Sequence, residues 1–289
     1  MPEQVKYDIF TFQLRPKRNI QTHLWNENLT AEEIMDRKNG LFSQSLDEHI
    51  GFYTRRGKLN YQVKHKDDES FLFRLANKKT VHLEQEFHRE SFPSEPSCAI
   101  MIWNNPDYQM IAIESDRTSF GSSKSVKNIL EKALSRKLEG VNLDIAIHPN
   151  YDESDFWDLV DRYDKEVQNI KFEFEYPNLP AVNKTINETL KQASKAIRSD
   201  KTKLEFSASK GDILDNVDVG NEQLTNLVKA SSEGAGSVKL KMKGYRRWET
   251  TGNNMRHEEF DSLEVDLSSE ESANWVASFI ERLRSIRDV

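Results

Sequence analysis

The sequence CAIMIWNNPDYQMIAIE occupies residues 98–114 and contains two apolar runs separated by a short polar one. The runs at 98–103 and 108–114 have the composition of buried strands. The segment Asn104-Asn-Pro-Asp107 between them is rich in residues that interrupt regular structure and is typical of a turn. Two apolar strands joined by so short a turn form an antiparallel hairpin. This stretch therefore predicts an antiparallel sheet in the first part of the chain.

Further segments extend this sheet toward the N-terminus. Residues 5–14 are rich in β-branched and aromatic residues, as strands are. Residues 58–66 alternate apolar and polar, and after an acidic turn the chain returns through 71–75, which predicts a second hairpin. A further strand is expected near 80–88. Residues 1–117 are thus predicted to form a mostly antiparallel β-rich domain.

Beyond a serine-rich stretch at 118–125, helices and strands alternate, which predicts an α/β sandwich with a C-terminal helix over 125–289. The expected elements are helices at 125–138, 154–163, 181–198, 221–231 and from 268 onward, and strands at 141–147, 170–176, 203–208, 237–243 and 260–267. Capping boxes begin helices at Thr30 and Ser268. The apolar stripe of the last helix predicts a core role, with a dimer or partner surface as the alternative. The whole chain is predicted to be α+β.

Composition limits the class of protein. Of 289 residues, 36% are hydrophobic, 31% are charged and 10% are aromatic, which describes a folded chain with much solvated surface. Cys98 is the single cysteine, so no internal disulfide forms, as in a reducing compartment. The N-terminus lacks the pattern of a signal peptide, and no apolar stretch approaches the roughly 18 residues of a membrane span. We expect a cytoplasmic protein that does not insert directly into a membrane.

No local catalytic, cofactor or metal motif is present. The sequence contains no HExxH, CxxC, phosphate-binding loop or G-x-S-x-G elbow, so we predict no catalytic residues, no metal and no cofactor. The glycines of Glu233-Gly-Ala-Gly236 follow a predicted helix and precede a strand, which favours a helix C-cap over a phosphate site.

A dispersed carboxylate site is the alternative. Asp144, Glu173, Glu175 and Glu205 lie on predicted neighbouring strands, where converging acids hold Mg²⁺ in metal-dependent nucleases. Acids that alternate along a half-exposed strand explain the same positions without any metal.

Two basic segments are the most distinctive feature of the sequence. The net charge of −7 excludes an even basic coat over the whole surface, but it is compatible with a local basic patch. In the first segment, three lysines share one face of the strand 237–243, and two arginines and a tryptophan follow it. The second segment, residues 55–66, contains no acid. The predicted nucleic-acid contacts are Lys239, Lys241, Lys243, Arg246, Arg247, Trp248, Arg55, Arg56, Lys64 and Lys66.

Cross-strand ion pairs are the alternative explanation for the lysines. If 237–243 and 260–267 pair as a hairpin, Glu264 and Asp266 lie opposite Lys239, Lys241 and Lys243. Such pairs contribute roughly 0.2–1 kcal/mol each and need no ligand. Arg246 and Arg247 lie beyond the strand and are less easily neutralised.

The order of these segments resembles the RexA-type phage-exclusion proteins and a set of uncharacterised bacterial proteins that accompany phage-defence genes. The similarity covers about two thirds of the chain and is one of element order and apolar pattern. The matching segments are Tyr7–Leu14, Ser70–Asn77, Cys98–Trp103 with Gln109–Glu114, the run onward through Leu130, Val141–Pro149 and Ile170–Asn178.

The resemblance implies a role in intracellular anti-phage defence. Proteins of this kind are expected to be non-enzymatic sensors that bind nucleic acid or a phage product, form homodimers and act with a separate protein effector. Three hypotheses follow: a nucleic-acid-binding or phage-sensing subunit, a metal-dependent nuclease effector, and a protein-only adaptor or inhibitor that docks through its last helix. The basic strand faces and the resemblance favour the first.

Overall fold

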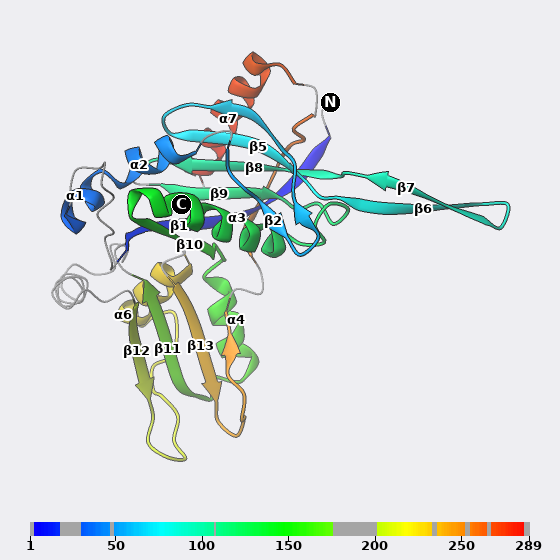
Figure 1. Cartoon of the computed structure of the whole chain (residues 1–289). Helices are drawn as coiled ribbons and strands as arrows, with labels where there is room; N and C mark the ends of the chain where they lie inside the picture. The colour runs from blue at the N-terminus through cyan, green and yellow to red at the C-terminus, as the bar shows by residue number, and fades with distance from the viewer. Residues whose placement is uncertain are drawn as a thin grey trace. The chain divides into compact units, whose positions relative to one another are not determined.

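The computed structural model confirms an α+β protein with an N-terminal antiparallel sheet and a C-terminal helix (Figure 1). The chain divides into two compact units, of which the first comprises residues 1–8, 14–147 and 257–289 and the second residues 9–13 and 148–256. The predicted boundary between residues 117 and 125 falls inside the first unit. The structure describes residues 3–17, 30–46, 49–106, 108–175, 201–232, 236–251, 255–264 and 267–285.

A seven-stranded sheet, in the order β10-β1-β9-β8-β5-β4, organises the first unit, and β15 pairs with the first half of β1. The pairs β4–β5, β5–β8, β8–β9 and β1–β15 are antiparallel. The predicted opening strand and both predicted hairpins are confirmed. The strands are β1 (Gln4–Pro16), β4 (Tyr61–Lys66), β5 (Ser70–Ala76), β8 (Ser97–Asn104), β9 (Gln109–Glu114), β10 (Leu143–Pro149) and β15 (His257–Asp261).

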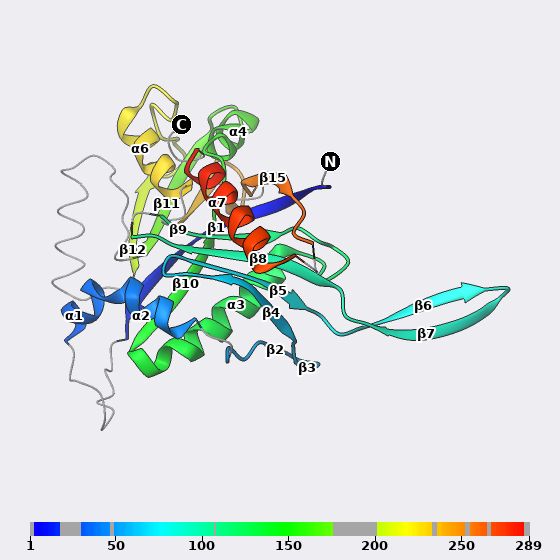
Figure 2. The ribbon, with the colours of Figure 1, turned by 90° about the horizontal axis from the view of Figure 1, so that it is seen from above.

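Helices cover both faces of this sheet. Successive residues of a strand point to opposite faces, and neighbouring residues of β1 contact different helices. The ring of Tyr7 lies 5.0 Å, between centroids, from that of Phe279, whereas Asp8 accepts a hydrogen bond of 2.6 Å from Ser123. These contacts place α7 (Ser269–Ser285) and α3 (Ser123–Leu138) on opposite faces (Figure 2).

The predicted core role of the last helix is confirmed, because Val276, Phe279 and Leu283 are buried. Both predicted capping boxes also form. The Thr30 side chain accepts from the Glu33 N–H, and the Glu33 carboxylate accepts from the Thr30 N–H. The other helices of this unit are α1 (Ala31–Asp36), α2 (Lys38–Ser45) and the short 3₁₀ helix η1 (Glu139–Val141).

Gly40 offers a stabilising substitution in α2. It is exposed within the helix, and a Cβ built on it meets nothing within 4 Å. Glycine is less favourable than alanine in a helix interior by about 0.5–1 kcal/mol. We expect Gly40→Ala to raise the free energy of unfolding by roughly that amount, measured as a higher urea midpoint at unchanged m-value. An unchanged or lower midpoint would contradict this expectation.

A two-stranded ribbon continues the β5–β8 pair beyond the sheet (Figures 1 and 2). It consists of β6 (Lys79–Gln85) and β7 (His88–Ser94), and Asn77 donates to the Pro96 carbonyl at its base. The strand predicted near 80–88 corresponds to β6 and the turn. A second, smaller hairpin consists of β2 (Tyr53–Thr54) and β3 (Gly57–Lys58).

The second unit is built on a four-stranded antiparallel sheet in the order β12-β11-β13-β14. Its strands and helices are β11 (Val167–Glu175), β12 (Lys201–Ser207), β13 (Gly236–Met242), β14 (Glu249–Thr250), α4 (Ser154–Arg162) and α6 (Glu222–Ala230). Both helices pack on one face of the sheet, where Phe156 of α4 and Val228 of α6 join Phe172 in a single core. The helix predicted at 181–198 lies outside the described residues.

The structure differs from two of the sequence expectations about this unit. The strand 237–243 does not pair with 260–267, because β13 lies between β11 and β14, and β15 pairs with β1. Gly236, the last residue of the predicted helix-cap segment, is the first residue of β13, opposite Phe174, and residues 233–235 lie outside the described residues. Of the two acids expected opposite the lysines, Glu264 is exposed beyond β15, and Asp266 lies outside the described residues.

Candidate functional site

One face of the second unit's sheet is lined by alternating lysines and acids. Lys239 lies on this face of β13, and its Nζ is 3.8 Å from Oε1 of Glu173 on β11. The same oxygen is 3.6 Å from Nζ of Lys203 on β12. Lys239 is therefore paired, as the alternative explanation expected, but its partner comes from β11 and not from residues 260–267.

A second ion pair extends the pattern. Nζ of Lys171, directly across from Lys239 on β11, is 3.7 Å from Oε2 of Glu205. The paired side chains are partly exposed to solvent, so each pair contributes about 0–1 kcal/mol to stability. The centre of this face is therefore close to neutral. Lys241, near its end, has no acidic partner among the described residues.

Positive charge collects instead on the turn that follows β13. Tyr245 N–H donates to the Met242 carbonyl at 3.2 Å, and Gly244 has φ +81°. A type II turn requires a residue in the left-handed conformation at its third position, and glycine adopts this conformation without steric cost. The tight turn leaves Lys243, Arg246 and Arg247 exposed. We call residues 243–248 the basic turn.

Two aromatic side chains accompany these cations. Tyr245 is 57% exposed and Trp248 38% exposed. The Tyr245 ring is held edge-on against Tyr163, with centroids 5.0 Å apart and planes at 77°. Such rings present faces on which a nucleobase can stack.

The charges of the basic turn are not neutralised within the part of the chain that the structure describes. No ion pair there involves Lys243, Arg246 or Arg247. Glu249, the nearest acid in sequence, is half-buried on β14. The basic turn therefore combines three available cations with two exposed rings.

The second predicted basic segment is not one continuous face. The pairing of β4 with β5 shifts register between Val63 and His65, so Lys64 lies in a β-bulge. The shift brings Lys66 onto the same side of β4 as Val63, and its Nζ donates to the Leu46 carbonyl. The expectation that Lys64 and Lys66 share a basic face is therefore wrong.

Arg55 and Arg56 are placed apart from those lysines. They form the exposed turn between β2 and β3, where the Arg56 N–H donates to the Thr54 hydroxyl. This short turn presents two cations but lacks the exposed aromatic pair of the basic turn.

The acids considered for a metal site are ion-pair partners. Asp144 lies 3.2 Å from Arg15 in the first unit. Glu173 and Glu205 pair with lysines in the second unit, and the Glu175 side chain lies outside what the structure describes. Among the described residues, no group of three His, Cys, Asp or Glu side chains is arranged to hold a metal ion.

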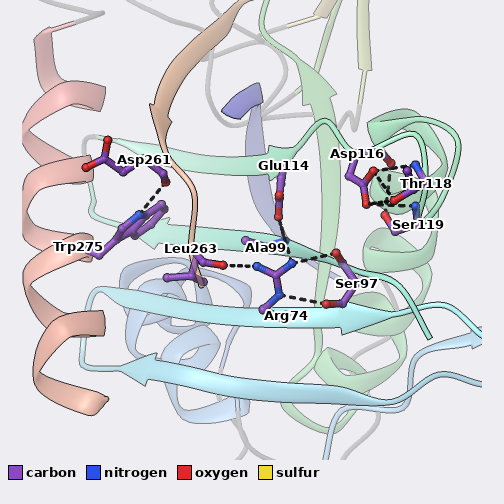
Figure 3. Close-up of polar contacts among 10 residues, drawn as sticks. All are labelled: Arg74, Ser97, Ala99, Glu114, Asp116, Thr118, Ser119, Asp261, Leu263 and Trp275. Carbon is purple, nitrogen blue, oxygen red and sulfur yellow. Dashed lines mark hydrogen bonds and ion pairs between the residues drawn. The ribbon is translucent and has the colours of Figure 1, made fainter. Parts of the chain in front are cut away.

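A buried polar network in the first unit was not predicted (Figure 3). Arg74, the one charged residue in the apolar strand β5, donates to Ser97 Oγ at 3.0 Å and to the Leu263 carbonyl. Its guanidinium lies 3.6 Å from the Glu114 carboxylate, and both side chains are only 11% exposed. Glu114 also accepts from the Ala99 N–H at 2.6 Å. A lone arginine within SFLFRLA was the sequence signal for this site.

This network has a structural role. Burial raises the pKa of Glu114, while the Ala99 N–H and Arg74 act in the opposite direction. Burial likewise raises the pKa of the nearby Cys98 thiol to about 12, so the thiol stays protonated and unreactive at neutral pH. Together with the bond from the Trp275 indole to the Asp261 carbonyl, Arg74 holds the segment between β15 and α7 on the sheet.

Helices long and apolar enough to cross a membrane are absent from the described residues. Comparison with known proteins gives no family assignment: no protein-family model matches the chain, and no curated protein matches it. The resemblance to RexA-type proteins stays a prediction, and the basic turn is the feature of the described residues on which a function can be argued.

Proposed function

We propose that this protein is a non-enzymatic nucleic-acid-binding subunit that contacts the phosphate backbone through its basic turn. The observation that carries the proposal is the concentration of three cations without acidic partners and two exposed aromatic rings within residues 243–248. Phosphate contacts supply most non-specific affinity, and aromatic rings add stacking to unpaired bases. Single-stranded nucleic acid is therefore the expected ligand class.

The overall charge supports a local contact. At a net charge of −7, most of the surface repels a phosphate backbone, so binding depends on one region and weakens steeply with salt. Lys241, which lies next to the basic turn on the same face of β13 as Lys239, is placed to extend the phosphate contacts. Lys239 contributes less because Glu173 already lies beside it.

The resemblance to RexA-type proteins supports placing this activity in anti-phage defence. In that proposal the protein senses phage nucleic acid and passes the signal to a separate protein effector. The ion pairs of Asp144, Glu173 and Glu205 favour this reading over a nuclease effector, because these acids already have cationic partners.

Removing the two arginines of the basic turn tests the proposal. Arg246→Ala/Arg247→Ala is expected to weaken binding of a labelled single-stranded oligonucleotide at least about tenfold at low salt. The slope of log K against log salt should fall in magnitude by about 1.4–1.8, because two phosphate contacts are lost. Fluorescence anisotropy across a salt series measures both quantities.

Lys171→Ala/Lys203→Ala is the matched control, since it removes the same charge from the same sheet. Both lysines are already paired with acids, so this variant should change affinity much less. Equal losses in the two variants would show a diffuse charge effect and reject the assignment to the basic turn. Undiminished binding by the arginine variant would reject it directly.

A further inference from the structure

The β6–β7 ribbon carries its large apolar side chains on one face. Val81 lies directly across from Phe92, and Leu83 follows Val81 by two residues, so all three point the same way. Val81 is 40% exposed, Leu83 57% and Phe92 43%.

The opposite face of the ribbon is polar. There His82 lies across from Ser91, with His82 Nδ1 and Ser91 Oγ 2.8 Å apart. A strand pair that alternates in this way is typical of a sheet covered on one side only. Every residue from Thr80 to Pro93 is exposed, so nothing in the described chain provides that cover. A ribbon of two strands alone is also marginally stable in water.

The tip of the ribbon presents an unusual pair of residues. Glu86 and Phe87 have φ of 50° and 64°, and Phe87 is 99% exposed. Two left-handed residues form the type I′ turn of a tight hairpin, which normally selects Asn-Gly. A bulky aromatic residue in this strained conformation gains no burial within the described chain.

The charges along the apolar face are ordered so that the face complements itself. Lys79 lies at the base, the Val81–Phe92 pair comes next, and Glu90, across from Leu83, lies nearer the tip. The Lys79 Nζ donates to the Thr118 carbonyl, which leaves its positive charge without an acid. This face has a cation at one end, an apolar pair in the middle and an anion at the other end. It is therefore complementary to a second, antiparallel copy of itself.

We propose that two copies of this chain associate through the apolar faces of their β6–β7 ribbons, antiparallel about a two-fold axis through the Val81–Phe92 pairs. In this register Lys79 of each copy lies opposite Glu90 of the other. The tip of each ribbon, with Glu86 and Phe87, then extends past the base of the partner's ribbon. In this register the two ribbons overlap over residues 79–83 of β6, or about 17 Å.

The test measures the mass of the full chain in solution. Sedimentation equilibrium across the micromolar range is expected to show a dimer for the wild type. Phe92→Glu places like charges together at the two-fold axis and should raise the dimer Kd at least about tenfold. Ser91→Glu adds the same charge to the opposite face of the same strand and should leave the dimer intact. All altered positions are exposed, and far-UV circular dichroism confirms that the variants fold.

A charge exchange distinguishes self-association from binding of a different partner. Lys79→Glu and Glu90→Lys should each weaken the dimer, and the double variant should restore most of the lost affinity, because each new charge meets its opposite on the other copy. A monomeric wild type would overturn the proposal. So would a dimer that Phe92→Glu leaves unchanged, or a double variant no tighter than either single one.

Discussion

Replacing Arg74 with alanine is expected to lower the free energy of unfolding by about 3–5 kcal/mol. The substitution leaves the Glu114 carboxylate buried without its cationic partner, held only by the Ala99 N–H. It also removes the donors to Ser97 and to the Leu263 carbonyl, so the segment before α7 loses its attachment to β5. Urea unfolding followed by far-UV circular dichroism measures the change in midpoint.

The stability that Arg74→Ala loses should depend on pH in a defined direction. Burial already raises the pKa of Glu114, and without Arg74 the pKa rises further. A carboxyl whose folded pKa lies above its unfolded value stabilises the fold fully below the unfolded value, and that contribution is lost as pH rises. The Glu114 contribution to the difference between wild type and Arg74→Ala should therefore narrow as pH falls through the raised pKa of Glu114 toward about 4.5, the ordinary pKa of a glutamate. A difference that widens in acid would contradict this account.

A double-mutant cycle separates the ion pair from the other bonds of Arg74. Arg74→Met/Glu114→Met should cost less than the sum of the two single substitutions, with a coupling of about 0.5–3 kcal/mol. Arg15→Ala is the control, because Arg15 and Asp144 form an ion pair of 3.2 Å with side chains 20% and 34% exposed. That variant should lose only about 0–1 kcal/mol.

Gly236→Ala is expected to destabilise the second unit by about 3 kcal/mol or more. A Cβ at this position would lie 1.6 Å from the backbone oxygen of Glu173 on β11. The obstacle is the backbone of a strand hydrogen-bonded on both sides, so it cannot rotate away as a side chain would. The β11–β13 pairing must separate near Phe174 for the methyl group to fit.

Amide hydrogen exchange shows which strands the Gly236→Ala substitution destabilises. Peptides from β11 and β13 should lose protection in Gly236→Ala, while peptides from β5 and β8 of the first unit should keep it. Gly40→Ala, the same chemical change at an unobstructed position, should leave exchange in β11 and β13 unaltered. Unchanged protection of β11 in Gly236→Ala would show that the close approach is not rigid.

Local features of this fold could be predicted from sequence, because their signals lie within a few residues. The β8–β9 hairpin follows from two apolar runs around Asn-Asn-Pro-Asp, and the capping box at Thr30 follows from the spacing to Glu33. The ribbon strand β7 was missed because Pro93 and several charged residues weaken its strand pattern.

Long-range pairing could not be predicted, and it changed the interpretation of the site. The assumption that sequence neighbours pair placed β13 beside residues 260–267, whereas its partner β11 lies more than 60 residues earlier. Glu173 of that strand, not Glu264, therefore lies beside Lys239. Arg246 and Arg247 were expected to be less easily neutralised because they follow the strand, and both are exposed, with no ion pair among the described residues.

The pairing of β1 with β15 has a consequence for synthesis. About 240 residues separate the end of β1 from the start of β15. At translation rates of about 5–20 residues per second, the ribosome takes roughly 10–50 s to cover that distance. Until then Tyr7 lacks both α7 and the strand that pairs beside it. The first unit is thus completed after the second has been synthesised, and the face of β1 that α7 covers lacks its partner throughout that interval.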